Sequence, residues 1–183
     1  MKPLIKQINY MKSIKKLVLF YFSLLALLGC NKLDDGSYVE PITIYEKMQG
    51  NWNLMNLKMI DQFAKANAIE PSEQNLSALF NYDTFQIEFN VDEKMKPTSY
   101  QVFGDVPPLF QLSGYWDLNT AYQSTGSQAI QIYLYSNDQK TDKTGTLLLT
   151  SVPGSNQEME LQLVRTSSGT PFVSYVFSLN SNN

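Results

Sequence analysis

The chain has 183 residues, of which 43% are hydrophobic and 17% are charged, with one cysteine and no histidine. The absence of histidine excludes Ser-His-Asp and Cys-His catalysis and imidazole zinc sites. Five of the 14 Lys and Arg residues precede Cys30, so the rest of the chain carries nine against 17 acidic residues, a net charge of −8. A surface of this sign repels nucleic-acid phosphates, so we expect no nucleic-acid partner.

Residues 1–29 have the layout of a secretory signal peptide. Lys12, Lys15 and Lys16 supply the positive start, and residues 17–28 are apolar almost throughout. As a helix this apolar run would rise about 18 Å, well short of the roughly 30 Å hydrocarbon core of a bilayer. We therefore expect a cleaved signal and not a permanent membrane span.

Leu27-Leu28-Gly29-Cys30 ends this run and resembles the lipobox of bacterial lipoproteins. The resemblance implies that the Cys30 thiol receives diacylglycerol, that the peptide is cut before it, and that the new amino group is acylated. Two or three acyl chains would hold the protein stably on a membrane. A signal peptide with an incidental cysteine is the alternative, and the true start codon stays open between Met1 and Met11.

Residues 30–41 are polar, include Gly36 and Pro41, and are typical of a tether. Fully extended, such a segment reaches about 35 to 40 Å. Within it, Lys32-Leu33-Asp34-Asp35 resembles the signal that sends some outer-membrane lipoproteins to the cell surface, whereas a plain solvated linker would look much the same. We expect an outer-membrane location and a single folded domain over residues 42–183.

Period-two alternation dominates the expected domain. In residues 84–91, Phe85, Ile87, Phe89 and Val91 alternate with polar residues, as in a half-buried strand. The eight strands predicted in this way are residues 50–60, 84–91, 99–103, 109–118, 128–135, 144–151, 157–165 and 172–179.

The connections between the predicted strands are mostly short and polar, which favours hairpins between successive strands. Residues 71–80 differ, because Pro71 begins a segment with Leu76 and Leu79 at helical spacing, which predicts one short helix between the first two strands. Gly114 interrupts the apolar row of residues 109–118 and predicts a bend or bulge there.

These elements predict an all-β fold, an eight-stranded antiparallel up-and-down β-barrel, with a sandwich of two sheets as the alternative. Closure into a barrel would remove the exposed strand edges. Gly50-Asn51-Trp52 at the opening of the first strand resembles the Gly-x-Trp motif of lipocalins. The resemblance implies that Trp52 plugs the closed end of the barrel and that Arg165, the one arginine, packs over it. No helix follows the last strand, so the chain is lipocalin-like and departs from lipocalins proper.

An eight-stranded barrel is either filled by side chains or has room for one small ligand. The expected ligand is a small hydrophobic or amphipathic molecule. Arg165 continues the inward face of its strand, so its guanidinium would bind a carboxylate or sulfate of that ligand, unless it covers the tryptophan or reaches water. The candidate ligand-binding residues are Trp52, Phe89, Trp116, Arg165 and Tyr175.

The alternative function is a non-catalytic interaction module that docks to an envelope protein or a glycan through its outer face. Tyr115, Tyr133 and Tyr135 alternate with the inward residues, and exposed tyrosines can stack on sugars. Glu158 and Glu160 project from one side of a strand, but a solvated strand face explains them better than a carboxylate-pair enzyme. We expect no enzyme, no metal site and no cofactor.

Replacement of Cys30 by Ser should abolish acylation and release the protein from membranes or leave it unprocessed, because the thiol is the acylated group. Metabolic labelling with palmitate, followed by membrane fractionation, measures both effects. Label that still attaches to the Cys30→Ser protein would contradict the lipobox interpretation.

Overall fold

The computed structural model describes residues 39–123 and 129–181. The elements reported below all belong to the unit Pro41–Asn183. The predicted signal peptide, Cys30 and most of the predicted tether lie outside the described residues. Over the described ranges, no helix is both long enough and apolar enough to cross a membrane.

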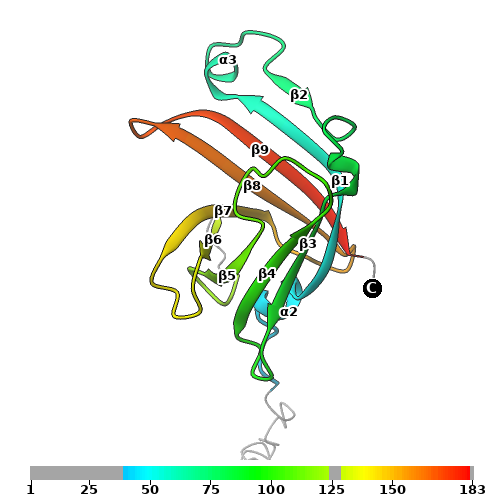
Figure 1. Ribbon diagram of the computed structural model, residues 1–183, viewed down its shortest axis with the longest axis vertical. Coiled ribbons are helices and arrows are strands. Elements are labelled where there is room, and N and C mark those ends of the chain that lie inside the picture. The colour runs from blue at the N-terminus through cyan, green and yellow to red at the C-terminus, as the bar shows by residue number, and fades with distance from the viewer. Residues whose placement is uncertain (1–38, 124–128, 182–183) are drawn as a thin grey trace, which may run out of the picture. The chain divides into compact units, whose positions relative to one another are not determined.

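Nine strands form one antiparallel sheet in the order β2-β1-β3-β4-β5-β6-β7-β8-β9, and pairing of β1 with β9 closes it (Figure 1). Eight of the strands make an up-and-down barrel, which confirms the predicted fold, and β2 is an extra strand on β1. The strands are β1 (Gly50–Asp61), β2 (Glu73–Asn75), β3 (Gln86–Val91), β4 (Pro97–Phe103), β5 (Ser113–Leu118), β6 (Ile130–Tyr135), β7 (Lys143–Ser151), β8 (Glu158–Ser167) and β9 (Thr170–Ser181). The helices are α2 (Ile44–Met48), α3 (Gln62–Ala66) and the 3-10 helix η1 (Tyr82–Thr84).

Strand β1 closes the barrel and contains a bulge. It pairs with β9 from Trp52 to Asp61, and the register shifts between Leu54 and Asn56, so Met55 is an extra residue. Met55 is exposed, whereas Leu57 beyond it is fully buried. The extra residue shifts the period-two pattern by one position, so apolar side chains point into the interior on both sides of the bulge. This shift explains the weak alternation of the strand in the sequence.

The predicted alternation of the other strands is confirmed by burial. Inward residues of successive strands are almost fully buried and interlock in the barrel, whereas their neighbours in sequence are half-buried or exposed. Burial of this apolar surface is the main source of stability. The inward residues include Phe85, Ile87, Phe89, Trp116, Leu118, Ile132, Leu134, Leu147, Leu149, Met159, Leu161, Leu163, Phe177 and Leu179.

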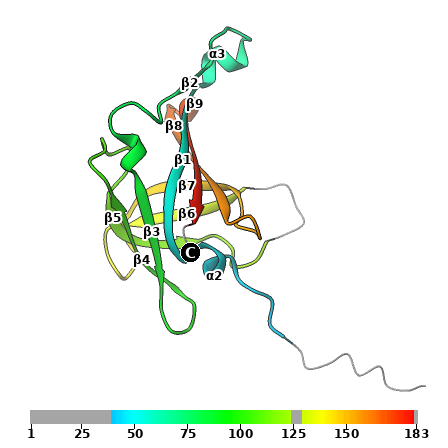
Figure 2. The same cartoon turned by 90° about the vertical axis from the view of Figure 1, so that its right-hand side faces the viewer.

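Helix α2 packs across the end of the barrel where β1 begins, which we call the closed end (Figure 2). It starts with a capping box: the Thr43 hydroxyl accepts the Glu46 N–H at 3.2 Å, and the Glu46 carboxylate accepts the Thr43 N–H at 2.6 Å. Its apolar side chains, among them Ile44 and Met48, are buried in the barrel core. This helix was not predicted, although Thr43-x-x-Glu46 is a sequence signal for it.

Two aromatic residues fix α2 to the barrel. The Trp52 indole N–H donates to the Met48 carbonyl at 2.8 Å, and the side chain is 2% exposed. The Tyr45 ring meets Trp116 edge-on with 5.9 Å between ring centroids, and its hydroxyl donates to the Asp117 carboxylate at 3.2 Å. The other Asp117 oxygen accepts from the Lys140 ammonium at 2.9 Å. Helix α2 and Trp52 thus close this end of the barrel together.

The helix predicted over residues 71–80 is wrong. The helix between the two strands is α3, which begins where the Asp61 carboxylate caps the Ala64 N–H at 2.9 Å. Residues 73–75 instead form β2 on the end of β1, and the Ser77 hydroxyl accepts the Leu57 N–H at 2.8 Å. Hydrogen bonds to β1 therefore override the local helical spacing.

The strand predicted over residues 109–118 is shorter, because β5 begins at Ser113 and residues 104–112 are a loop. Leu112, which belongs to the apolar row of the predicted strand, is exposed. Gly114 marks no bulge; a Cβ there would lie 2.3 Å from the Tyr135 carbonyl oxygen, so glycine permits close approach of β5 and β6.

Replacement of Trp52 by Ala should lower the free energy of unfolding by about 3 to 5 kcal/mol, because it removes a buried aromatic side chain and its hydrogen bond to α2. Urea titration followed by circular dichroism measures this loss. Met55→Ala on the same strand is the matched control and should change stability by less than about 0.5 kcal/mol, since Met55 is exposed. Equal effects of the two substitutions would contradict the role of Trp52.

Stability should decline in alkali because of Tyr45. Burial, followed by the charge and hydrogen bond of Asp117, raises the pKa of Tyr45 from 10.0 to about 12. A raised folded-state pKa means that this stabilisation is complete below pH 10 and is lost as the pH rises toward 12. Urea unfolding across this range should show a smaller decline for Tyr45→Phe than for the native protein. Tyr122→Phe, at an exposed position, should retain the full decline.

Candidate functional site

The barrel end opposite α2, which we call the mouth, is crossed by the connection between β4 and β5. We call residues 104–112 the mouth loop. Side chains from the barrel hold its carbonyl groups: the Tyr82 hydroxyl donates to Pro107 at 3.2 Å, and the Tyr100 hydroxyl donates to Gln111 at 3.0 Å. Pro107 and Pro108 have no N–H to donate, so this part of the loop cannot join a strand ladder as a donor.

The mouth is wide because strand pairing stops early on two sides. The ladder between β7 and β8 runs only from the pair Leu148–Gln162 to the pair Ser151–Glu160. Strand β8, in contrast, stays paired with β9 as far as Ser167. Strands β1 and β3 share only four residue pairs, near the closed end. Among the described residues, the upper part of β8 therefore has a strand partner on one side only, and the mouth loop lies over the opened end.

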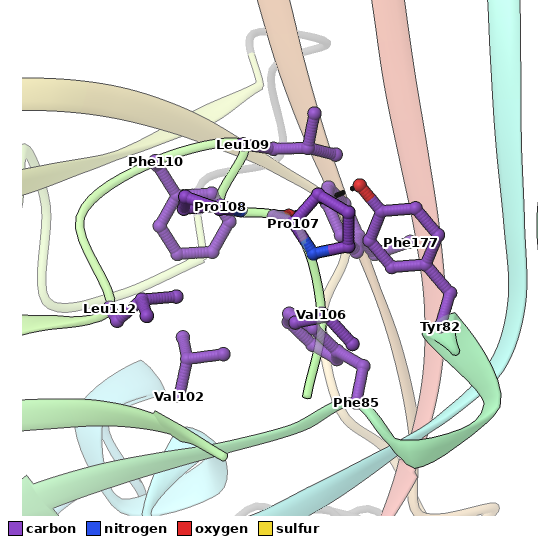
Figure 3. Close-up of a pocket in the computed structure, with 10 residues that line it drawn as sticks. All are labelled: Tyr82, Phe85, Val102, Val106, Pro107, Pro108, Leu109, Phe110, Leu112 and Phe177. Atoms are coloured by element: carbon purple, nitrogen blue, oxygen red, sulfur yellow. Dashed lines mark hydrogen bonds between the residues drawn. The ribbon is translucent and has the colours of Figure 1, made fainter. Parts of the chain in front are cut away.

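A pocket lies beneath the mouth loop (Figure 3). Its lining is apolar or aromatic, and in the figure Phe110 and Leu112 lie across from Tyr82. Its cavity volume is about 10 Å³, close to the space that one water molecule needs. The lining residues are Tyr82, Phe85, Val102, Val106, Pro107, Pro108, Leu109, Phe110, Leu112 and Phe177.

The main polar side-chain group in the lining is the Tyr82 hydroxyl, which is already bonded to Pro107. Burial raises the pKa of Tyr82, with a smaller contribution from Tyr175 nearby. The Tyr82 phenol is therefore neutral near pH 7. The pocket carries no charge within it and suits an apolar group.

Arg165 stands at the mouth, and its guanidinium donates to the Leu109 carbonyl oxygen. The predicted packing of Arg165 over Trp52 is wrong, because Arg165 lies opposite Val173 on β9 whereas Trp52 lies opposite Ser181. Eight residues along a strand correspond to about 27 Å, so the two side chains are at opposite ends of the barrel. The arginine is exposed and forms no salt bridge within the part of the chain that the structure describes.

The predicted ligand-binding residues separate into two groups. Trp52, Phe89 and Trp116 are buried in the closed half, where the Phe89 and Trp116 rings lie 5.0 Å apart, and they leave no exposed surface for a ligand. Arg165 and Tyr175 lie at the mouth. The mouth loop was not predicted, although a Pro107-Pro108 pair followed by apolar residues is an unusual connector between hairpin strands.

The predicted aromatic outer face is formed by neighbouring strands. Tyr115 on β5 lies opposite Tyr135 on β6, and the Tyr133 hydroxyl donates to the Gln131 amide oxygen at 2.9 Å. The Lys143 ammonium lies 4.9 Å from the centre of the Tyr133 ring. The three tyrosines are half-buried, whereas Lys143 is exposed.

The two carboxylates on one side of β8 have polar partners close by. Glu160 accepts a hydrogen bond from the Thr150 hydroxyl at 2.7 Å, and Glu158 accepts one from the Asn156 amide at 2.9 Å. Each carboxylate thus has a separate local partner. No cluster of acidic, histidine or cysteine side chains suited to a metal ion occurs over the described ranges.

Comparison with known proteins gives a family but no described function. A family model with the description "Domain of unknown function (DUF5004)" matches residues 30–180. No curated protein and no solved structure matches the chain.

Proposed function

The chain belongs to the DUF5004 family, and we propose that it is a lipid-anchored, non-catalytic binding module of the bacterial outer membrane. The lipobox-like Leu27-Leu28-Gly29-Cys30 and the apolar run before it support the anchor. The polar tether would carry the barrel away from the membrane, on the cell surface if Lys32-Leu33-Asp34-Asp35 acts as an export signal.

The ligand of this module is a small hydrophobic or amphipathic molecule that binds at the mouth. The observation that carries this proposal is the apolar pocket beneath the mouth loop, with an exposed arginine beside it. Pockets with apolar walls and a few convergent polar groups are typical of small-molecule sites. The lipocalin-like Gly50-x-Trp52 motif agrees with a ligand that enters from one end of a barrel.

The size of the pocket determines how the ligand would enter. A cavity of about 10 Å³ holds no such molecule, and the closed half is filled by Phe89, Trp116 and their neighbours. The ligand would therefore replace side chains of the mouth loop, above all Leu109 and Phe110, which are only partly buried. Binding and displacement of the loop are one event in this proposal.

The second candidate is an interaction module that uses the outer face formed by Tyr115, Tyr133 and Tyr135. The register that places Tyr115 beside Tyr135 on adjoining strands favours it. Tyrosines with neighbouring amides can stack on sugar rings and bond to their hydroxyl groups. The partner would be a glycan or an envelope protein.

Photochemical labelling of the full-length protein in membranes tests the mouth. A long-chain alcohol with a diazirine on its tail should label residues 102–112 and Tyr82. Phe110→Ala enlarges the apolar space and should increase this labelling several-fold, because apolar cavities bind apolar molecules. Val106→Phe fills the space and should decrease it. Mass spectrometry of the peptides gives the positions and yields.

Ile42→Phe is the matched control, because it adds a ring at an exposed position before α2. It should leave labelling of the mouth unchanged, and thermal melting of each variant verifies folding. If properly folded Phe110→Ala and Val106→Phe proteins label the mouth loop no differently from the native protein, the proposal is wrong and the outer face becomes the leading candidate.

A further inference from the structure

We infer that the mouth selects amphiphiles with a single anionic head group, held by Arg165, and an unbranched or lightly branched apolar tail in the pocket beneath the mouth loop. The inference rests on the proposed function and adds the chemical class of the ligand. It excludes neutral and cationic amphiphiles as preferred ligands.

Arg165 has unused capacity to bind an anion. A guanidinium presents five N–H donors in a planar fork, and the described contacts of Arg165 comprise one hydrogen bond, to the neutral carbonyl of Leu109. The three salt bridges found between described residues use Lys58, Lys65 and Lys140, not this arginine. A carboxylate would accept two of the N–H groups in parallel, which is stronger than a bond to one neutral carbonyl.

Leu109 contacts both Arg165 and the pocket, so it indicates where the head and the tail of such a ligand would lie. Its carbonyl oxygen contacts Arg165, whereas its side chain lines the pocket. A single residue thus presents an oxygen acceptor to the guanidinium and a branched hydrocarbon to the apolar cavity. A fatty acid likewise has an oxygen acceptor beside a hydrocarbon chain, and its carboxylate carries a full negative charge. It would take the place of Leu109 on Arg165 as its chain displaces the loop.

Asp105 lies in the mouth loop itself, but the hydrogen bonds and salt bridges found among the described residues bring no carboxylate to Arg165. Asp61 uses its carboxylate to cap α3 at Ala64, and Glu73 pairs with Lys58 at 2.8 Å on the outer side of β1. The guanidinium is therefore the positive group at this pocket. It lies at the surface, so a head group bound there would keep contact with water while the tail is buried.

Competition among ligands with equal tails tests the inference. The diazirine alcohol labels the mouth of the full-length protein in membranes, and dodecanoate, dodecanol and dodecyltrimethylammonium compete with it. Dodecanoate should compete about three- to tenfold more strongly than dodecanol, since a charge-assisted bidentate contact is added, and the cation should compete least. In Arg165→Gln, dodecanoate should fall to the level of dodecanol, whereas dodecanol should compete at least as well as before. Arg165→Lys should retain part of the preference.

Lys94→Gln is the matched control, because it removes one exposed positive charge in the turn between β3 and β4 at the closed end. It should retain the full preference for dodecanoate. If the three competitors act equally in the native protein and Arg165→Gln changes nothing, the head-group inference is wrong and the mouth site stands. If the alcohol labels no residue of the mouth, the proposed function itself fails.

Discussion

Pairing of β1 with β9 is the interaction on which the rest of the structure depends. Without it the sheet would have two long open edges, and the apolar rows of all the strands would lack a common interior. Strand β1 also leads directly from α2 at one end to α3 and β2 at the other. The bulge at Met55 lets this one strand keep apolar residues inside along both halves of the barrel. One long strand therefore positions the closed end and one side of the mouth.

The two ends of the barrel are stabilised in different ways. At the closed end, aromatic packing around Trp116 is combined with the chain of polar contacts from Tyr45 through Asp117 to Lys140. At the mouth, strand ladders stop early, and side chains bonded to loop carbonyls take over. In the proposed function, the filled half would keep its form while the mouth rearranges around a ligand.

The sequence predicted the barrel well and its ends poorly. Alternation identified strands such as β3 and β8 because inward burial is recorded directly in residue type. The segment 71–80 misled because its helical spacing is local, whereas the hydrogen bonds of Ser77 to β1 are made across the fold. For the site, Arg165 and Tyr175 do lie at the mouth, but Trp52, Phe89 and Trp116 belong to the core. Inward strand positions carry apolar residues whether the interior is filled by side chains or by a ligand, so the sequence pattern does not distinguish the two.

The adjacent prolines of the mouth loop set its dynamics apart from those of the barrel. Pro107 and Pro108 donate no backbone hydrogen bonds, and Tyr82 and Arg165 hold the middle of the loop through its carbonyl oxygens. This middle part can therefore detach while the Val102 N–H of β4 keeps its bond to the Leu112 carbonyl at 2.6 Å. Opening of this segment would be a local unfolding event that costs little free energy and is separate from global unfolding. Amide hydrogens in this segment would then exchange with solvent far sooner than those of β6 or β8, in a native ensemble that already contains the opened form.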